Sequence, residues 1–208
     1  MSRSRERRGL VPVEIALVLA IAVIPWPEGI QLGIPLVIVA SACRWIRGRG
    51  WGEVWKGSRD RALIGAIAGL AALGLALLVG TPAIEALGTR GIEWSRFPIV
   101  RGSGLQLVTV LVLVSIGSLA AELAFRGWLV ERVLELSPGP PILPILCGAL
   151  AEAIVTPGDV TARIGAGLFG AGLGWIYIAS GRSVVAPALA RIAFTGGALI
   201  LEAFRLIG

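Results

Sequence analysis

An uncharged helical stretch that ends in an acid and a base constrains most strongly what this chain can fold into. Leu105 to Ala121 carries no charged side chain, Glu122 follows it, and Arg126 lies four residues later. This spacing places the carboxylate and the guanidinium on one helix face, where they can pair. A charged side chain within a membrane span costs roughly 2.5–3.5 kcal/mol on insertion scales, so it marks a candidate functional site. A plain salt bridge at a helix end is the competing interpretation.

Composition indicates a polytopic membrane protein. Hydrophobic residues make up 56% of the 208 residues, charged residues only 15%, and the mean hydropathy is +0.85, which lies outside the range of soluble domains. The 29 glycines are typical of closely packed transmembrane helices. The net charge of +6 comes largely from arginines in short tails and loops and is read as a topology signal. The lipid bilayer is therefore the expected partner, and no nucleic-acid partner is expected.

The sequence predicts an all-α transmembrane bundle of six or seven spans. Residues 10–43 are apolar around Trp26-Pro27-Glu28-Gly29, and they are too long for one span of about 20 residues and short for two. A hairpin at Pro27 and a single kinked helix are both open, and Glu14 argues against a cleaved signal peptide. The further spans are expected at 62–79, 105–130, 142–155, 164–179 and 184–207.

A basic segment over residues 44–61 separates the first two expected regions of membrane helix. Its tryptophans, Trp45, Trp51 and Trp55, fall within one arc of a helix, which predicts a short helix at the membrane surface. We expect a basic cytoplasmic tail at 1–9, an N-terminal transmembrane region at 10–104 and a transmembrane core at 105–208. Placing the cationic segments inside puts the N-terminus in the cytoplasm. The expected location is a prokaryotic inner membrane.

The missing residue types narrow the chemistry that the chain can perform. The sequence has no histidine, which excludes a His-Glu-x-x-His zinc protease and a Ser-His dyad. Its two aspartates, Asp60 and Asp159, lie among polar or turn residues, and its two cysteines, Cys43 and Cys147, lack metal-ligand spacing. Neither a cofactor nor a metal is expected, so chemistry would depend on glutamate and arginine.

Two regions together carry a family resemblance. Ala121-Glu-Leu-Ala-Phe-Arg-Gly127 resembles the Glu-Glu-x-x-Phe-Arg-Gly motif of the CPBP (CAAX protease and bacteriocin-processing, or Abi) family of intramembrane glutamate proteases. Phe169-Gly170, Ser180-Gly-Arg-Ser183 and Ala186-Pro-Ala-Leu-Ala-Arg191 follow in the order of that family's last two helices. The resemblance covers approximately residues 105–204.

The resemblance implies peptide hydrolysis in which the first motif glutamate activates a water and two later histidines help to place it. This chain departs from the pattern at four family positions, where it has Ala121, Ala151, Arg191 and Thr195. Glu122 and Arg126 are retained, and Glu152 is a candidate substitute acid about 100° around its helix from Ala151. Arg191 is expected to pair with Glu122 in a charge-neutral core.

Two functions fit this scaffold. The favoured hypothesis is a family member with lost or altered proteolysis, acting as a membrane adaptor or regulator that binds a membrane protein, peptide or lipid. The alternative is an active endopeptidase that processes a membrane-proximal or C-terminal segment with Glu122 as base and Arg126 as its orienting residue. Alanines 121 and 151 also fit a protease silenced by substitution, whereas Arg191 and Thr195 do not.

Overall fold

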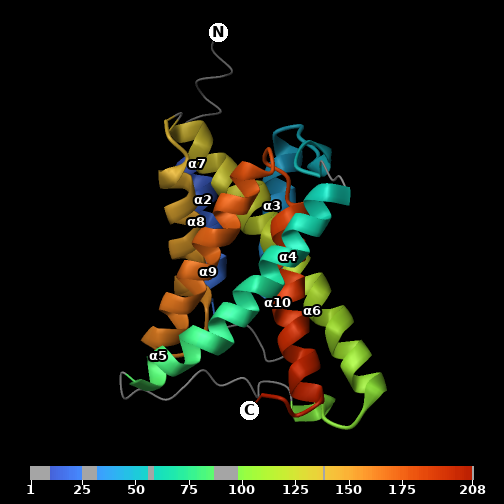
Figure 1. Cartoon of the computed structure of the whole chain (residues 1–208). Helices are drawn as coiled ribbons and strands as arrows, with labels where there is room; N and C mark the ends of the chain where they lie inside the picture. The colour runs from blue at the N-terminus through green and yellow to red at the C-terminus, as the bar shows by residue number, and fades with distance from the viewer. Residues whose placement is uncertain (1–9, 25–31, 56–58, 87–97, 138, 208) are drawn as a thin grey trace.

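The computed structural model describes residues 10–24, 32–55, 59–86, 98–137 and 139–207, and these form an all-helical bundle (Figure 1). Within them lie seven apolar helices, four of which are long enough to cross a membrane. The predicted class of fold is confirmed. The basic tail 1–9, the turn around Pro27, Lys56 and part of the 80–103 loop lie outside the described residues.

The helices fall into a long set and a short set. The long ones are 19 to 33 residues in length: Arg59–Ala86 (α4, η2 and α5), Gly104–Leu136 (α6, η4 and α7), Val160–Ala179 (α9) and Val185–Ala203 (α10). The short ones have 13 or 14 residues: Val11–Val23 (α2), Gly33–Ile46 (α3) and Ile142–Val155 (α8). At 1.5 Å per residue each short helix measures about 20 Å, less than the hydrocarbon thickness of a bilayer.

The first apolar stretch is a helical hairpin and not one kinked helix. α2 and α3 pack against each other. Arg47, which follows α3, donates from Nε to Glu14 Oε1 in the first turn of α2 at 2.7 Å. The pair joins the start of one helix to the end of the other, so the two helices run antiparallel.

Residues 44–55 do not form the expected surface helix. α3 continues to Ile46, and a short 3-10 turn, Trp51–Glu53 (η1), follows. Trp45 is 83% exposed, whereas Trp51 is partly buried, donates its indole N–H to Ser41 Oγ at 3.1 Å and lies under the Arg44 guanidinium. The partly buried indole thus has a partner for its N–H and for its ring face, as an amphipathic aromatic side chain requires.

Small residues let α4 approach α10 very closely. A Cβ atom on Gly65 would lie 2.2 Å from the carbonyl oxygen of Ala186, and one on Gly69 would lie 2.0 Å from that of Ala190. Two glycines four residues apart therefore face two alanines four residues apart. This is the small-residue packing that brings membrane helices together in the absence of a hydrophobic driving force.

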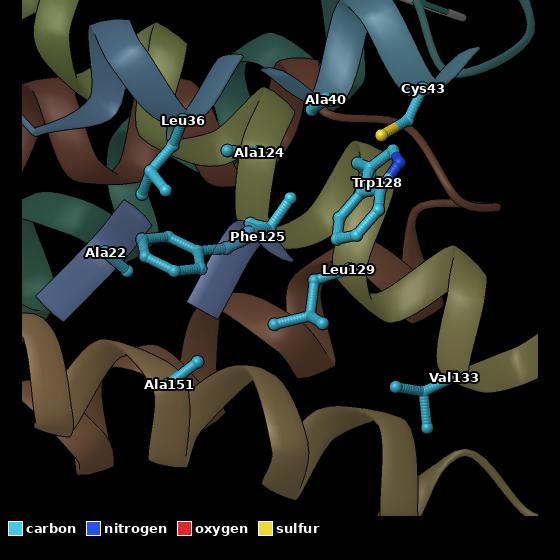
Figure 2. Packing of buried hydrophobic residues seen from close by; sticks show 11 residues of the cluster. Ala22, Leu36, Ala40, Cys43, Ala124, Phe125, Trp128, Leu129, Val133 and Ala151 are labelled. Atoms are coloured by element: carbon cyan, nitrogen blue, oxygen red, sulfur yellow. The ribbon is translucent and has the colours of Figure 1, made fainter. Parts of the chain in front are cut away.

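The π-helical turn η4 (Phe125–Val130) lies at the centre of the bundle, and all six of its residues are buried. Phe125, Trp128 and Leu129 pack against side chains of α2, α3 and α8, and Figure 2 shows this cluster around Leu36, Ala22 and Ala151. On the side towards α10, Gly127 faces Trp51 and Val184. The π-helical turn adds one residue to the regular spacing of helical hydrogen bonds, which changes the direction of the side chains that follow Glu122.

Arg49 and Arg182 lie at one end of the bundle, together with the segments that join its helices there. Arg49 pairs with Glu135 at 2.5 Å, Arg182 pairs with Glu131 at 3.1 Å, and the N–H of Val184 donates to the carbonyl of Val54 at 3.0 Å. In Figure 1 the end of α3, α7 and the start of α10 lie together at this end. The predicted topology requires that these segments share a side of the membrane.

Candidate functional site: a buried four-charge cluster beside a pocket

The acid and base of the first motif are both completely buried. Glu122 lies near the end of α6, Arg126 lies in η4, and the side chains of both are 0% exposed. Arg126 Nη1 donates to Glu122 Oε1 at 3.2 Å. This pair lies within the bundle and not at a solvent-exposed helix end.

Two further charged side chains join this pair from other helices. Arg191 on α10 donates from Nε to Glu122 Oε1 at 2.6 Å, and its Nη2 donates to Glu152 Oε1. Glu152, on α8, also lies 2.8 Å from Arg126 Nη2 through its Oε2. The expected contact between Arg191 and Glu122 is present. Two carboxylates and two guanidiniums alternate, and the cluster has no net formal charge.

A glycine on α9 closes the cluster on the remaining side. The carbonyl oxygen of Gly170 accepts a hydrogen bond from Arg126 Nη2 at 2.6 Å. A Cβ atom on Gly170 would lie 2.7 Å from Glu152 Oε2, so only glycine lets the α9 backbone come this close to the carboxylate. The neighbouring Phe169 places its ring 5.6 Å from the guanidinium carbon of Arg191, within the range of a cation–π contact.

A pocket of about 180 Å³ lies against the cluster. Its walls come from five helical segments and are mostly apolar: Leu32, Gly33, Ala121, Phe125, Glu152, Val155, Thr156, Pro157 and Arg191. Arg191 is the most accessible of the four charged side chains, at 17% exposed, against 5% for Glu152. Glu122 and Arg126 lie behind them, out of reach of the pocket.

The four family positions at which this chain differs have different environments. Ala121 lines the pocket, so a longer side chain there would enter it. Ala151 is 3% exposed and packs in the hydrophobic cluster near Phe125 and Leu129 (Figure 2). Arg191 bridges both acids. Thr195 is half-buried one turn further along α10 and is not among the described residues that line the pocket.

One family model matches this part of the chain: residues 102–196 match the type II CAAX prenyl endopeptidase Rce1-like family. The matched segment runs from the start of α6 into α10 and contains all four charged residues of the cluster. The kinship expected from the Phe-Arg-Gly motif is thereby confirmed. No curated protein and no solved structure matches the chain.

Two parts of the site around the four-charge cluster could not be predicted from the sequence. The Gly170 carbonyl was not predicted, because a backbone acceptor leaves no residue-type signal beyond the glycine that admits it. The pocket wall formed by Leu32 and Gly33 comes from α3, outside the matched residues. A glycine at the first position of a short apolar helix was the available signal, since a Cβ there would lie 2.7 Å from the carbonyl oxygen of Gly117 in α6.

Proposed function

We propose that this chain is a non-hydrolytic Rce1-like membrane protein, an adaptor or regulator that binds a membrane protein, peptide or lipid at the pocket beside the four-charge cluster. The observation that carries the proposal is the double role of Arg191. It occupies a position where the family pattern has histidine, and its guanidinium bonds to Glu122 and Glu152 together.

Glutamate-dependent hydrolysis needs a carboxylate that can take a proton from water. Glu122 Oε1 accepts hydrogen bonds from two guanidiniums, and both oxygens of Glu152 lie within ion-pair distance of an arginine. Arginine keeps its proton at any physiological pH and cannot exchange it with a reacting water as histidine does. Positions 121 and 151 supply only methyl groups. The chain therefore retains two acids but lacks the further glutamate and the histidine that would help a carboxylate to activate water.

One observation favours the alternative of an active endopeptidase. Glu122 Oε2 has no hydrogen-bond partner among the described residues, which leaves one carboxylate oxygen to accept a proton. In that alternative Glu122 is the base, and Arg126 and Arg191 stabilise the oxyanion that forms on the peptide carbonyl.

The experiment that separates the two functions is a cleavage assay on the purified protein in lipid nanodiscs. The substrates are tagged membrane peptides whose scissile bonds lie at several depths, tested with the unmodified protein and with Glu122→Gln. We expect no cleavage by either. Cleavage by the unmodified protein that is lost in a folded Glu122→Gln variant would overturn the adaptor proposal and support the endopeptidase.

A further inference from the structure

The pocket presents one nitrogen of Arg191 that the cluster does not use. Nε and Nη2 of Arg191 hold the two carboxylates, while Nη1 takes part in no hydrogen bond or ion pair among the described residues. Nη1 is also absent from the buried nitrogens that lack a partner, and Arg191 lines the pocket. Nη1 therefore keeps N–H donors that the cluster does not use, on a side chain that lines the pocket.

The accessible charge in the pocket is positive even though the cluster as a whole is neutral. Glu152, the acid that borders the pocket, has its two oxygens turned to Arg126 and Arg191. α3 also begins at the pocket, with Leu32 and Gly33 in its wall, and the first N–H groups of a helix carry a partial positive charge. Both features favour an anionic group.

The rest of the wall is mostly apolar. Leu32, Phe125 and Val155 line the pocket, and each belongs to or borders an apolar helix. A bound molecule must therefore combine an anionic end with apolar groups. The volume of about 180 Å³ corresponds to roughly six water molecules, which suits a headgroup better than a folded segment.

We propose that this pocket binds the anionic headgroup of a membrane lipid, with the phosphate accepting hydrogen bonds from Arg191 Nη1. The inference rests on the proposed function, because a hydrolytic site would need the same space for water and a peptide carbonyl. Guanidinium and phosphate form strong charge-assisted hydrogen bonds, and the pocket is the space that a side chain longer than alanine at position 121 would fill.

A lipid fits the walls better than a peptide does. A peptide backbone at membrane depth needs partners for its N–H and C=O groups. The pocket offers three polar side chains, and two of them, Glu152 and Arg191, already belong to the cluster. No strand edge exists among the described residues to pair with an extended chain. In a phospholipid, the phosphate oxygens are the main groups that need hydrogen-bond donors from the protein.

The test is a binding measurement on the full chain in neutral maltoside detergent, by native mass spectrometry and calorimetry. The probes are dioctanoyl phosphatidylglycerol, dioctanoylglycerol without the phosphate, inorganic phosphate, and a membrane peptide with a free C-terminal carboxylate. We expect saturable binding of one phosphatidylglycerol and at least about tenfold weaker binding of the others, since a hydrogen bond to a charged group contributes roughly this factor. Equal binding of inorganic phosphate or dioctanoylglycerol, or preference for the peptide, would overturn the proposal.

Two variants address the pocket by different routes. Ala121→Leu fills the space and leaves the four charges in place. Arg191→Lys keeps the positive charge but replaces the planar guanidinium by a single ammonium nitrogen, which cannot hold both carboxylates and a phosphate in the same geometry. Each is expected to weaken phosphatidylglycerol binding about 10- to 100-fold, and Arg49→Gln, which removes a cation paired with Glu135 at another part of the bundle, is expected to leave it unchanged. If Arg191→Lys does not fold, Ala121→Leu alone decides. Unchanged binding in folded Ala121→Leu contradicts the inference.

The outcomes separate this inference from the proposed function. A protein that neither cleaves peptides nor binds phosphatidylglycerol keeps the non-hydrolytic assignment and loses the lipid site. A protein that cleaves peptides in a Glu122-dependent manner loses the non-hydrolytic assignment, whatever its lipid binding.

Discussion

Arg191 Nε and Glu122 Oε1 lie 2.6 Å apart although 69 residues separate them in the chain. The bond ties α10 to the end of α6 at the depth of the bundle centre. Because Arg191 also reaches Glu152 on α8, one side chain fixes the relative positions of three helices. Without it the two buried acids would share the single cation of Arg126, so the arginine has a structural effect beyond its effect on chemistry.

A double-mutant cycle on this pair should show strong coupling. Arg191→Gln and Glu122→Gln are each expected to lower the free energy of unfolding by about 3–5 kcal/mol, because each leaves the buried cluster with one unbalanced charge. The double variant should lose less than the sum, with a coupling of about 0.5–3 kcal/mol. Unfolding in detergent by denaturant titration measures all three. Arg182→Gln, at an exposed pair, should cost no more than about 1 kcal/mol. Additive losses would contradict a direct interaction.

Gly170→Ala should disturb the cluster without changing any charge. The new methyl group would lie 2.7 Å from Glu152 Oε2 and 3.3 Å from Ala149 Cα, so α8 and α9 must move apart or the carboxylate must turn away. We expect a loss of about 1–3 kcal/mol, as for other overpacked sites. Gly172→Ala, two residues along the same helix and with nothing within 4 Å of its Cβ, is the matched control. A Gly170→Ala protein as stable as that control would mean that α9 does not approach Glu152 this closely.

Gly69→Ala should separate α4 from α10. Its Cβ would lie 2.0 Å from the carbonyl oxygen of Ala190, a backbone atom that cannot rotate away. The thermal unfolding midpoint in detergent should fall, in line with a loss of about 1–3 kcal/mol. Gly74→Ala, on the same helix with open space around its Cβ, should be neutral or slightly stabilising, because alanine favours the helix by roughly 0.5–1 kcal/mol. Equal midpoints for the two variants would rule out the close contact.

Water-soluble thiol reagents should distinguish the pocket from the core. In a background without Cys43 and Cys147, a cysteine placed by Ala121→Cys lines the pocket and should react with a charged maleimide. A cysteine placed by Ala124→Cys, one turn later at a position that is 1% exposed, should react at least about tenfold more slowly, because burial lowers both access and the thiolate fraction. If the cysteine at position 121 reacted as slowly as the buried cysteine at position 124, the pocket would be closed to water.

The sequence determined the class of fold and the identity of the charged residues better than their geometry. Apolar runs and turn residues located the seven helices, since membrane spans are long and strongly hydrophobic. Glu122, Arg126, Glu152 and Arg191 were found as ionisable residues in apolar surroundings, which is a local signal. The alternating arrangement of the two acids and the two arginines in space has no such local signal. It depends on η4, on the short α8 and on the closeness of α9 at Gly170, and each of these is a property of packing.

Trp51 shows why the prediction of a membrane-surface helix in the basic segment was wrong. Three tryptophans in a basic segment match an interfacial pattern, and Trp45 conforms to it with 83% of its surface exposed. Trp51 instead finds Ser41 for its N–H and Arg44 for its ring face. Residue type alone cannot separate the two outcomes, because both satisfy the same amphipathic side chain.

The unequal helix lengths have a consequence for the surrounding membrane. α8 ends at Val155 after 14 residues, while the continuous helix from Gly104 to Leu136 has 33. At 1.5 Å per residue α8 is about 20 Å long, which is less than the hydrocarbon thickness of about 30 Å. The lipid annulus must therefore thin beside α8, or the molecule must tilt. Hydrophobic mismatch of this kind favours thinner membranes, and it draws polar headgroups inward on the flank where α8 stops.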